Sequence, residues 1–517
     1  MKTPLVITFD VGTQSARGMI VNPSGEILYK IQKVYSPAYH SSEPGWAEQS
    51  ADYYWDCICE ISRELAEQSG SRWKDIVALS LTTMRNTVVC VDKKGKPLAD
   101  AIVWCDQRQA NNIPTLPTSK RTIFKAIAMD KVIDAQMKSA HCNWFKYDRP
   151  EIWKKTDKYL MISTYLIYKF TGKFVDCDAS LTGHVPFNNR KRQWQKPNEL
   201  TRCFFDVEPE KLCEVVKPGT IVGPITEEAS KLTGILSGTE LVATGPDKGC
   251  ETLGLSCNTR DKAAISFGTT ATVQVTVDRY LEPVPHFPPY LSLMDGSFSP
   301  EIPVTRGYWL ISWFKREFAQ KEMEQAKLHG VSAEELLNKR LTEIPPGCDG
   351  LVFQPYFNSA SNVPIARGSM VGFSDIHTRI HIYRAIIEGI NFALMDGLKT
   401  IERRGDLKVK ELFVAGGGSQ SNLICQMTAD MFGLPVNRIQ THEVSGLGSS
   451  IVAFTGVGIF NSLQHAIDEM VHIERTFVPS KELNKIYQKL YTEVFKDIFP
   501  RLLPVYKKAQ IYQMKGL

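Results

Sequence analysis

The chain has 517 residues, of which 43% are apolar and 23% charged, as is typical of a folded globular protein. Because one hydrophobic core stops growing near ~250–300 residues, this length predicts two large domains. The formal net charge of +5 comes from 61 basic and 56 acidic residues scattered along the chain, which argues against the concentrated basic face of a nucleic-acid-binding protein.

The chain opens with segments that read as strands. Leu5–Phe9 is apolar and partly β-branched, and it runs into Asp10-Val11-Gly12-Thr13-Gln14-Ser15. Arg17–Val21 and Glu26–Val34 predict two further strands, separated by a turn at Asn22–Gly25. The first residues lack the layout of a signal peptide, because their apolar stretch ends at Asp10.

Helix and strand then alternate. Asp52–Ser69 has apolar residues at helical spacing, whereas Ile76–Leu81 and Thr87–Val91 predict strands. Leu241–Thr244 predicts another strand, and Gly245–Gly249 turns from it into an apolar helix. This order predicts an α/β fold.

The second half repeats the opening of the first. Lys262–Ser266 predicts a short strand that enters Phe267-Gly268-Thr269-Thr270, and Ala271–Val277 predicts the next strand. Two short matches are weak evidence of a duplication, so two unrelated hairpins are the alternative. If the halves are duplicated, the two Gly-Thr turns face each other across a cleft, where their backbone N–H groups suit a polyphosphate.

A third glycine-rich turn lies further along. Leu412–Ala415 predicts a buried strand, Gly416–Ser419 the turn, and Asn422–Phe432 a helix, an order compatible with nucleotide binding. The GxGxxG and GxxxxGK spacings are absent, so neither a dinucleotide fingerprint nor a P-loop is predicted. Taken alone, such glycines also form ordinary tight turns.

Two aspartates follow predicted strands. Asp10 stands beside the first Gly-Thr turn, where a carboxylate can hold Mg²⁺ through water, although turn aspartates are common. Asp247 stands between a strand end and a helix start, the place where α/β proteins bind ligands. It is a candidate general base for a hydroxyl, and a helix N-cap is the alternative.

Polar side chains and one tryptophan follow two other predicted strands: Arg85, Asn86, Trp104, Asp106 and Arg108. Hydrogen-bonding groups beside an aromatic ring are what polyol recognition requires, and scattered loop residues are the alternative. The histidines form no metal pattern and no GxSxG elbow occurs. Twelve cysteines without a CxxC pair predict buried free thiols, and no run reaches the ~18 apolar residues of a membrane helix, so a cytoplasmic protein is expected.

Taken together, the motifs resemble those of the FGGY carbohydrate kinases from about residue 5 to about residue 476. The matching segments of the first half are Asp10–Arg17, Pro44–Gln49, Ile102–Arg108 and Gly245–Gly249. Those of the second half are Ser266–Thr270, Ala366–Gly368, Val371–Phe373, His377–Arg379, Arg384–Phe392 and Gly416–Gln426, with Ala429-Asp430 and Pro435. Each motif is modest, but their joint order and spacing are specific to this family.

The resemblance implies an α/β protein with two actin-like (ribonuclease H-like) ATPase domains, at 1–257 and 258–517, that close on ATP and Mg²⁺. It implies Asp247 as general base and Asp10 as the metal-binding residue. The implied ATP-binding residues are Gly12, Thr13, Gln14, Ser15, Arg17, Gly268, Thr269, Thr270, Gly417, Gly418 and Asn422. The implied sugar-pocket residues are Arg85, Asn86, Trp104 and Asp106.

Departures from the family pattern leave the substrate open. Arg85-Asn86 stands where xylulose kinases usually carry Met-His and glycerol kinases Arg-Glu, and Pro246 and Lys248 flank the aspartate where small or amide residues are usual. Lys248 can lower the pKa of the neighbouring base or bind an anionic substrate, or it can point into solvent. The resemblance is strongest to the branch near xylulose, glycerol and autoinducer-2 kinases.

We therefore expect ATP-dependent phosphorylation of a small sugar or polyol, such as xylulose or a related pentose, by a cytoplasmic protein that can form a homodimer. Nucleic acid and membranes are not expected as partners. An ATP-driven conformational module, or a catalytically silent sugar sensor, is the alternative. Trp104, Arg85 and Asp247 argue against the conformational module, which would not need them. The presence of both Asp10 and Asp247 argues against the silent sensor.

Overall fold

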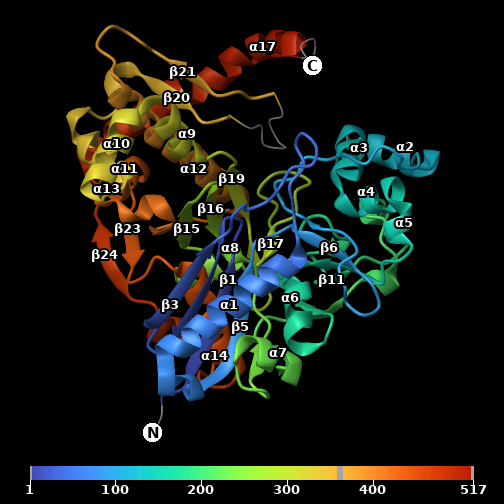
Figure 1. Cartoon of the computed structure of the whole chain (residues 1–517). Coiled ribbons are helices and arrows are strands. Elements are labelled where there is room, and N and C mark those ends of the chain that lie inside the picture. Colours follow the sequence, from blue (N-terminus) through green and yellow to red (C-terminus); the bar gives the residue numbers. More distant parts are fainter. Residues whose placement is uncertain (1–2, 127–128, 358–364, 514–517) are drawn as a thin grey trace. The chain divides into compact units, whose positions relative to one another are not determined.

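The computed structural model describes residues 3–126, 129–357 and 365–513 (Figure 1). The chain divides into two compact units, and neither is one continuous segment. The first unit contains Met1–Gly254, Tyr290–Gly296 and Glu443–Val471. The second contains Leu255–Pro289, Ser297–His442 and His472–Leu517. Two short excursions from the second half of the sequence therefore belong to the first unit.

A six-stranded mixed sheet forms the centre of the first unit, in the order β13-β14-β5-β1-β2-β3. Its strands are β1 (Leu5–Val11), β2 (Ser15–Val21), β3 (Ile27–Val34), β5 (Ile76–Thr83), β13 (Ile221–Pro224) and β14 (Glu240–Val242). β1 pairs antiparallel with β2 and parallel with β5, and β14 continues the parallel part. All seven residues of β1 are buried, because layers of the unit cover both faces of this central strand. The predicted strands of this region are confirmed.

The second unit has a sheet of the same design, in the order β19-β16-β15-β22-β23-β24. Its strands are β15 (Lys262–Phe267), β16 (Ala271–Val275), β19 (Glu301–Val304), β22 (Glu411–Ala415), β23 (Val436–Ile439) and β24 (Ile473–Phe477). β15 pairs antiparallel with β16 and parallel with β22, as β1 does with β2 and β5. Strand order and directions match throughout, so the two Gly-Thr turns occupy the same position in a repeated, actin-like α/β architecture.

Helices α1 (Ala51–Ser69), α8 (Asp247–Gly254) and α14 (Val444–Gly456) cover the sheet of the first unit. α14 comes from far along the sequence, yet it packs on β1, β5 and α8 (Figure 1). Glycine makes this approach possible, because a Cβ on Gly448 would lie 1.9 Å from the carbonyl oxygen of Cys250. The Ser449 hydroxyl also donates to Ser80 Oγ over 2.9 Å, which fixes α14 against β5.

A smaller four-stranded sheet in the first unit carries the segment that follows β5. It has the order β4-β7-β6-β8, with β4 (Glu48–Gln49), β6 (Val88–Val91), β7 (Ala101–Ile102) and β8 (Lys158–Met161). The other helices of this unit are α2 (Thr118–Ala126), α3 (Asp130–Ser139), α4 (His141–Asp148), α5 (Pro150–Trp153), α6 (Ile162–Thr171), α7 (Glu227–Thr233) and α15 (Leu463–Met470). Asn86 follows β5 and precedes β6, and Trp104 follows β7, so both lie after strands as the sequence predicted.

The helices of the second unit are α9 (Trp309–Phe318), α10 (Gln320–His329), α11 (Ala333–Lys339), α12 (Arg379–Gly405), α13 (Asn422–Phe432), α16 (Lys481–Lys489) and α17 (Lys496–Gln513). α12 packs along β16 and β19, and α13 follows the third glycine turn as predicted. All twelve cysteines are free thiols, and ten of them are buried, which confirms the predicted buried thiols. Among the described residues, none of the helices combines the length and apolar character of a membrane span.

Candidate active site

The carboxyl ends of β1 and β5 bring the first candidate residues together. The two strands are parallel neighbours, so both end at the same edge of the sheet. The backbone N–H of Met84 donates to the carbonyl oxygen of Val11 over 2.9 Å. Arg85 and Asn86 therefore continue beside the Gly-Thr turn that follows β1.

Asp10 is a buried carboxylate at this edge. It lies opposite Arg17 of β2, whose Nη1 is 3.4 Å from Asp10 Oδ2. Burial raises the pKa of Asp10 to about 7, the positive charge of Arg17 opposes the shift, and the carboxylates of Asp247, Glu443 and Glu251 add to it. The charges of three other carboxylates of the first unit thus act on Asp10.

This oxygen-rich set fits Mg²⁺, which prefers hard oxygen ligands and usually keeps several waters. Arg17 Nε and Lys30 Nζ hold the Glu443 carboxylate, at 3.4 and 2.8 Å. In the part of the chain that the structure describes, no three acidic, histidine or cysteine side chains converge closely enough to enclose a metal alone. The residues therefore suit a cation that is bound mainly through water and phosphate.

Asp247 is the first residue of α8, and it follows β14 after a short turn. Its Oδ1 accepts a hydrogen bond of 2.7 Å from the backbone N–H of Lys248. Burial raises the pKa of Asp247, and the positive charges of Arg85 and then Lys248 oppose that shift. The Lys248 ammonium lies 3.0 Å from Glu251 Oε1, one turn along the helix. Lys248 thus pairs with the carboxylate that joins the cluster around Asp10.

Arg85 and Asn86 are held by residues from distant segments. The guanidinium carbon of Arg85 lies 4.1 Å from the centroid of the Tyr290 ring. Asn86 has a φ of 60°, and its Oδ1 accepts from the Thr182 hydroxyl over 3.4 Å. Gly183 is needed here, because a Cβ would lie 2.0 Å from Asn86 Oδ1. Both side chains therefore have defined positions beside the Gly-Thr turn.

Trp104 contacts the Gly-Thr turn directly. Its indole Nε1 donates a hydrogen bond of 2.7 Å to the Thr13 hydroxyl. The Trp104 backbone N–H also lies 3.3 Å from the Thr87 hydroxyl, which fixes the chain after β7. The Trp104 side chain is still 38% exposed. A residue expected at the sugar therefore touches a residue expected at the phosphates.

Asp106 lies in a buried clamp. Arg108 Nε and Nη2 each donate to its carboxylate over 2.8 Å, and the Ala47 N–H donates over 2.6 Å. The Arg108 guanidinium also stacks over the rings of Trp46 and Trp144, at 3.9 and 4.5 Å. The Asp106 side chain has 0% exposure. A direct contact between Asp106 and a sugar stays a prediction.

In the second unit, the second and third glycine turns lie side by side, because β15 and β22 are parallel neighbours. Gly416 has a φ of 81°, and a Cβ there would lie 2.7 Å from the carbonyl carbon of Phe267. A Cβ on Gly418 would lie 2.4 Å from the Tyr308 ring. The Tyr308 N–H donates to the carbonyl of Gly268 over 3.0 Å. Two turns that the sequence separates by about 150 residues form one glycine-lined edge.

The remaining candidates of the second unit flank that edge. Thr269 is exposed, and the Thr270 hydroxyl donates to the carbonyl of Thr305 over 3.1 Å. Gly417 is exposed and has open space where a Cβ would stand. Asn422 begins α13, and its Oδ1 accepts from Arg438 Nη1 over 3.0 Å. In the first unit, Gln14 is exposed, while Ser15 is buried and accepts from Gln32.

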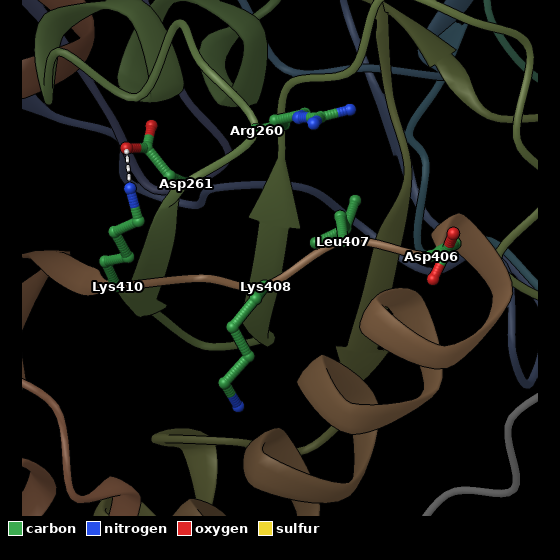
Figure 2. Close-up of a pocket in the computed structure, with 6 residues that line it drawn as sticks. All are labelled: Arg260, Asp261, Asp406, Leu407, Lys408 and Lys410. Carbon is green, nitrogen blue, oxygen red and sulfur yellow. Dashed lines mark ion pairs between the residues drawn. The ribbon is translucent and has the colours of Figure 1, made fainter.

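A hollow of about 590 Å³ lies elsewhere on the second unit (Figure 2). Its lining residues are Arg260, Asp261, Asp406, Leu407, Lys408 and Lys410, and Lys410 Nζ is 3.6 Å from Asp261 Oδ2. These residues precede β15 and β22, so the hollow opens at the amino ends of the parallel strands. Ligands of such sheets bind at the carboxyl ends, where the glycine turns lie. The hollow is therefore not the candidate site of this unit, which lies at the glycine turns.

Sequence reasoning missed three residues of the candidate site. Glu251 follows Asp247 by four positions, so helical spacing alone places both on one face of α8. Glu443 and Tyr290 carried no such signal, because each reaches the first unit only through an excursion of the chain.

Comparison with known proteins extends over nearly the whole chain. Residues 5–254 match the FGGY family of carbohydrate kinases, N-terminal domain, and residues 263–457 match its C-terminal domain. The uncharacterized sugar kinase YgcE of Escherichia coli (strain K12) is 26% identical over 491 residues, which are 95% of this chain and 92% of that protein. A xylulose kinase of Staphylococcus epidermidis (strain ATCC 12228 / FDA PCI 1200) is 26% identical over 506 residues, with 95% of each chain covered.

Among solved structures, a gluconate kinase from Lactobacillus acidophilus superimposes with a TM-score of 0.82. It is 22% identical, and the match covers 98% of this chain and 99% of that chain. At this identity the likeness shows the shared fold.

Proposed function

Since this chain belongs to the FGGY family of carbohydrate kinases and is an ATP-dependent sugar kinase, we propose that Asp247 is the general base for its sugar hydroxyl. The observation that carries this proposal is the position of Asp247 in the first unit. The charge of Arg85 opposes the rise in the pKa of Asp247. The charge of the Asp247 carboxylate in turn helps to raise the pKa of Asp10. A base, a cation and a second carboxylate thus occur together beside the Gly-Thr turn.

The surroundings of Asp247 suit proton acceptance. Burial raises its pKa, which makes the carboxylate more basic than one in water. The positive charges of Arg85 and Lys248 favour its ionised form and oppose that shift. Asp247 would take the proton of the attacking hydroxyl while Arg85 and Asn86 hold the remainder of the acceptor.

We assign Asp10 to the metal, with Glu251 and Glu443 in its surroundings. Mg²⁺ offsets phosphate charge in phosphoryl transfer. Asp10 would hold it through water, and the ion pair between Lys248 and Glu251 keeps this cluster from being wholly anionic. Asp106 would act indirectly, by fixing the chain that carries Trp104.

Backbone and hydroxyl donors would hold the phosphates. Gly12 to Ser15 with Arg17 form one phosphate segment, and Gly268 to Thr270 form the second. Gly417, Gly418 and Asn422 would border the adenosine. In this assignment residues 1–257 carry the sugar site and the first phosphate segment, and residues 258–517 carry the other ATP-binding residues. The free thiols favour the cytoplasm as its compartment.

The acceptor we propose is a small sugar or polyol, with xylulose and related pentoses first. A relative is named a xylulose kinase and a structural neighbour a gluconate kinase, so gluconate belongs among the candidates. The second candidate function is a nucleotide-driven conformational module. Such a module would not require Asp247, Arg85 and Trp104.

A coupled ADP-release assay with Mg-ATP tests the function. We expect one strong responder among xylulose, ribulose, glycerol, erythritol, fuculose, rhamnulose, gluconate and autoinducer-2. The expected result is sugar-dependent ADP release that greatly exceeds the rate without acceptor. ADP release at one rate with and without every acceptor would instead favour the conformational module.

The metal-free protein is expected to lose stability as the pH rises from about 4 to about 7. The pKa of Asp10 is 3.8 when unperturbed and about 7 when folded, so the folded state keeps a proton that the unfolded state has released. The contribution of Asp10 to stability therefore falls as the pH rises through this range, with a slope on the order of 1 kcal/mol per pH unit. Urea unfolding without Mg²⁺ from pH 4 to pH 8 measures this slope. Asp10→Asn should reduce this slope, and equal slopes in both proteins would contradict the expectation.

A further inference from the structure

The hydrogen bond between Trp104 and Thr13 joins two groups that the proposed function keeps apart. Trp104 Nε1 lies 2.7 Å from Thr13 Oγ1, within the first unit. Thr13 stands in the turn between β1 and β2, and Trp104 follows β7. Residue 104 was expected to offer its ring face to a sugar, yet its polar edge is directed at the phosphate turn.

The chemistry of the two groups fixes the direction of this hydrogen bond. An indole N–H is a donor only, whereas a hydroxyl has one proton and two acceptor lone pairs. Thr13 Oγ1 must therefore accept from Trp104, and its own proton is turned toward a third group. A phosphate oxygen only accepts, so a hydroxyl oriented in this way is preset to donate to it.

The surroundings of the pair support such presetting. The Trp104 backbone is fixed by the contact with Thr87, and the clamp of Asp106 and Arg108 holds the next residues of the segment. Thr13 is partly exposed and Trp104 is 38% exposed, so the pair borders solvent rather than the core. A substrate can therefore reach the Thr13 hydroxyl.

We infer that Trp104 is a positioning residue for phosphoryl transfer, which orients the Thr13 hydroxyl as a donor to the transferred phosphate. This inference rests on the proposed function for the role of Thr13 at the phosphates. Donors already oriented toward developing charge contribute strongly to catalysis, because no reorganisation is needed during the reaction. In this role Trp104 acts through its N–H, and its ring is secondary.

The matched variants are Trp104→Phe, which keeps a ring and removes the N–H, and Thr13→Val, which keeps the shape and removes the hydroxyl. Thr13→Ser is the control that retains the hydroxyl. With an acceptor that responds, Trp104→Phe should lower kcat about tenfold, and Thr13→Val about a hundredfold, with KM for the sugar nearly unchanged. The double variant should be no slower than Thr13→Val alone, since both act through one hydroxyl.

A binding experiment tests the inference without any acceptor. Titration calorimetry with Mg-ADP, alone and with beryllium fluoride, measures how much affinity the phosphate mimic adds. Trp104→Phe should reduce that gain about tenfold, and Thr13→Ser should retain it. An unchanged gain in Trp104→Phe, a raised KM with constant kcat, or additive effects in the double variant would each overturn the inference. Silence of the wild type toward every sugar would count against the proposed function alone.

Discussion

Asp247→Asn should lower kcat by about three orders of magnitude, because a general base contributes roughly 10²- to 10⁴-fold to a proton-transfer step. Asparagine has the same shape and is as good as aspartate at the start of a helix. The substitution therefore keeps the helix start of α8 and removes only the basic oxygen. Steady-state ADP release with the responding sugar measures the effect.

A measurement of nucleotide binding distinguishes loss of the general base from unfolding of the variant. Calorimetric titration with Mg-ADP should give nearly the same affinity for Asp247→Asn and for the wild type. Glu251→Gln is the matched control, since it removes a carboxylate from the same face of α8 and should cost much less in kcat. A fall in kcat below tenfold for Asp247→Asn would exclude its role as general base.

Arg108→Met should destabilise the first unit by about 3–5 kcal/mol, the usual cost of breaking one side of a buried ion pair. Arg108 has 1% side-chain exposure, and its loss leaves the Asp106 carboxylate buried without its cation. The stacking over Trp46 and Trp144 is lost as well. The urea midpoint, followed by tryptophan fluorescence, should fall clearly.

Two further variants test whether the loss of the clamp between Arg108 and Asp106 causes this destabilisation. Adding Asp106→Leu to Arg108→Met removes the stranded charge and should recover part of the lost stability. Arg316→Met breaks an ion pair with Glu317 whose side chains are 61% and 44% exposed, so it should cost less than about 1 kcal/mol. Equal losses for Arg108→Met and Arg316→Met would contradict the structural role of the clamp.

Local patterns in the sequence predicted the repeated core well. An apolar run that is buried on both faces, followed by glycine and a β-branched residue, indicated β1 and β15 with little ambiguity. The strand before Asp247 was also predicted, because its residues form a short apolar run that ends at a glycine turn. The alternative of two unrelated hairpins is wrong, since the sheets share one strand order.

Long-range packing determines the features of the site that could not be predicted from the sequence. Nothing near Asp106 in the sequence shows that both carboxylate oxygens bind Arg108, since this depends on how β4 and β7 pair. The contact between Trp104 and Thr13 joins residues 91 positions apart. Tyr290 and Glu443 reach the first unit through excursions that no local pattern encodes. Pairings of this kind are set by the whole fold and not by propensity.

The return of α14 to the first unit has a consequence for synthesis on the ribosome. About 190 residues separate Gly254 from Glu443, and at roughly 5–20 residues per second they take about 10–40 s to make. Throughout that interval the faces of β1, β5 and α8 that α14 will cover stay open. The first unit therefore stays incomplete while most of the second unit is being made, and its nascent form needs protection from aggregation until α14 emerges.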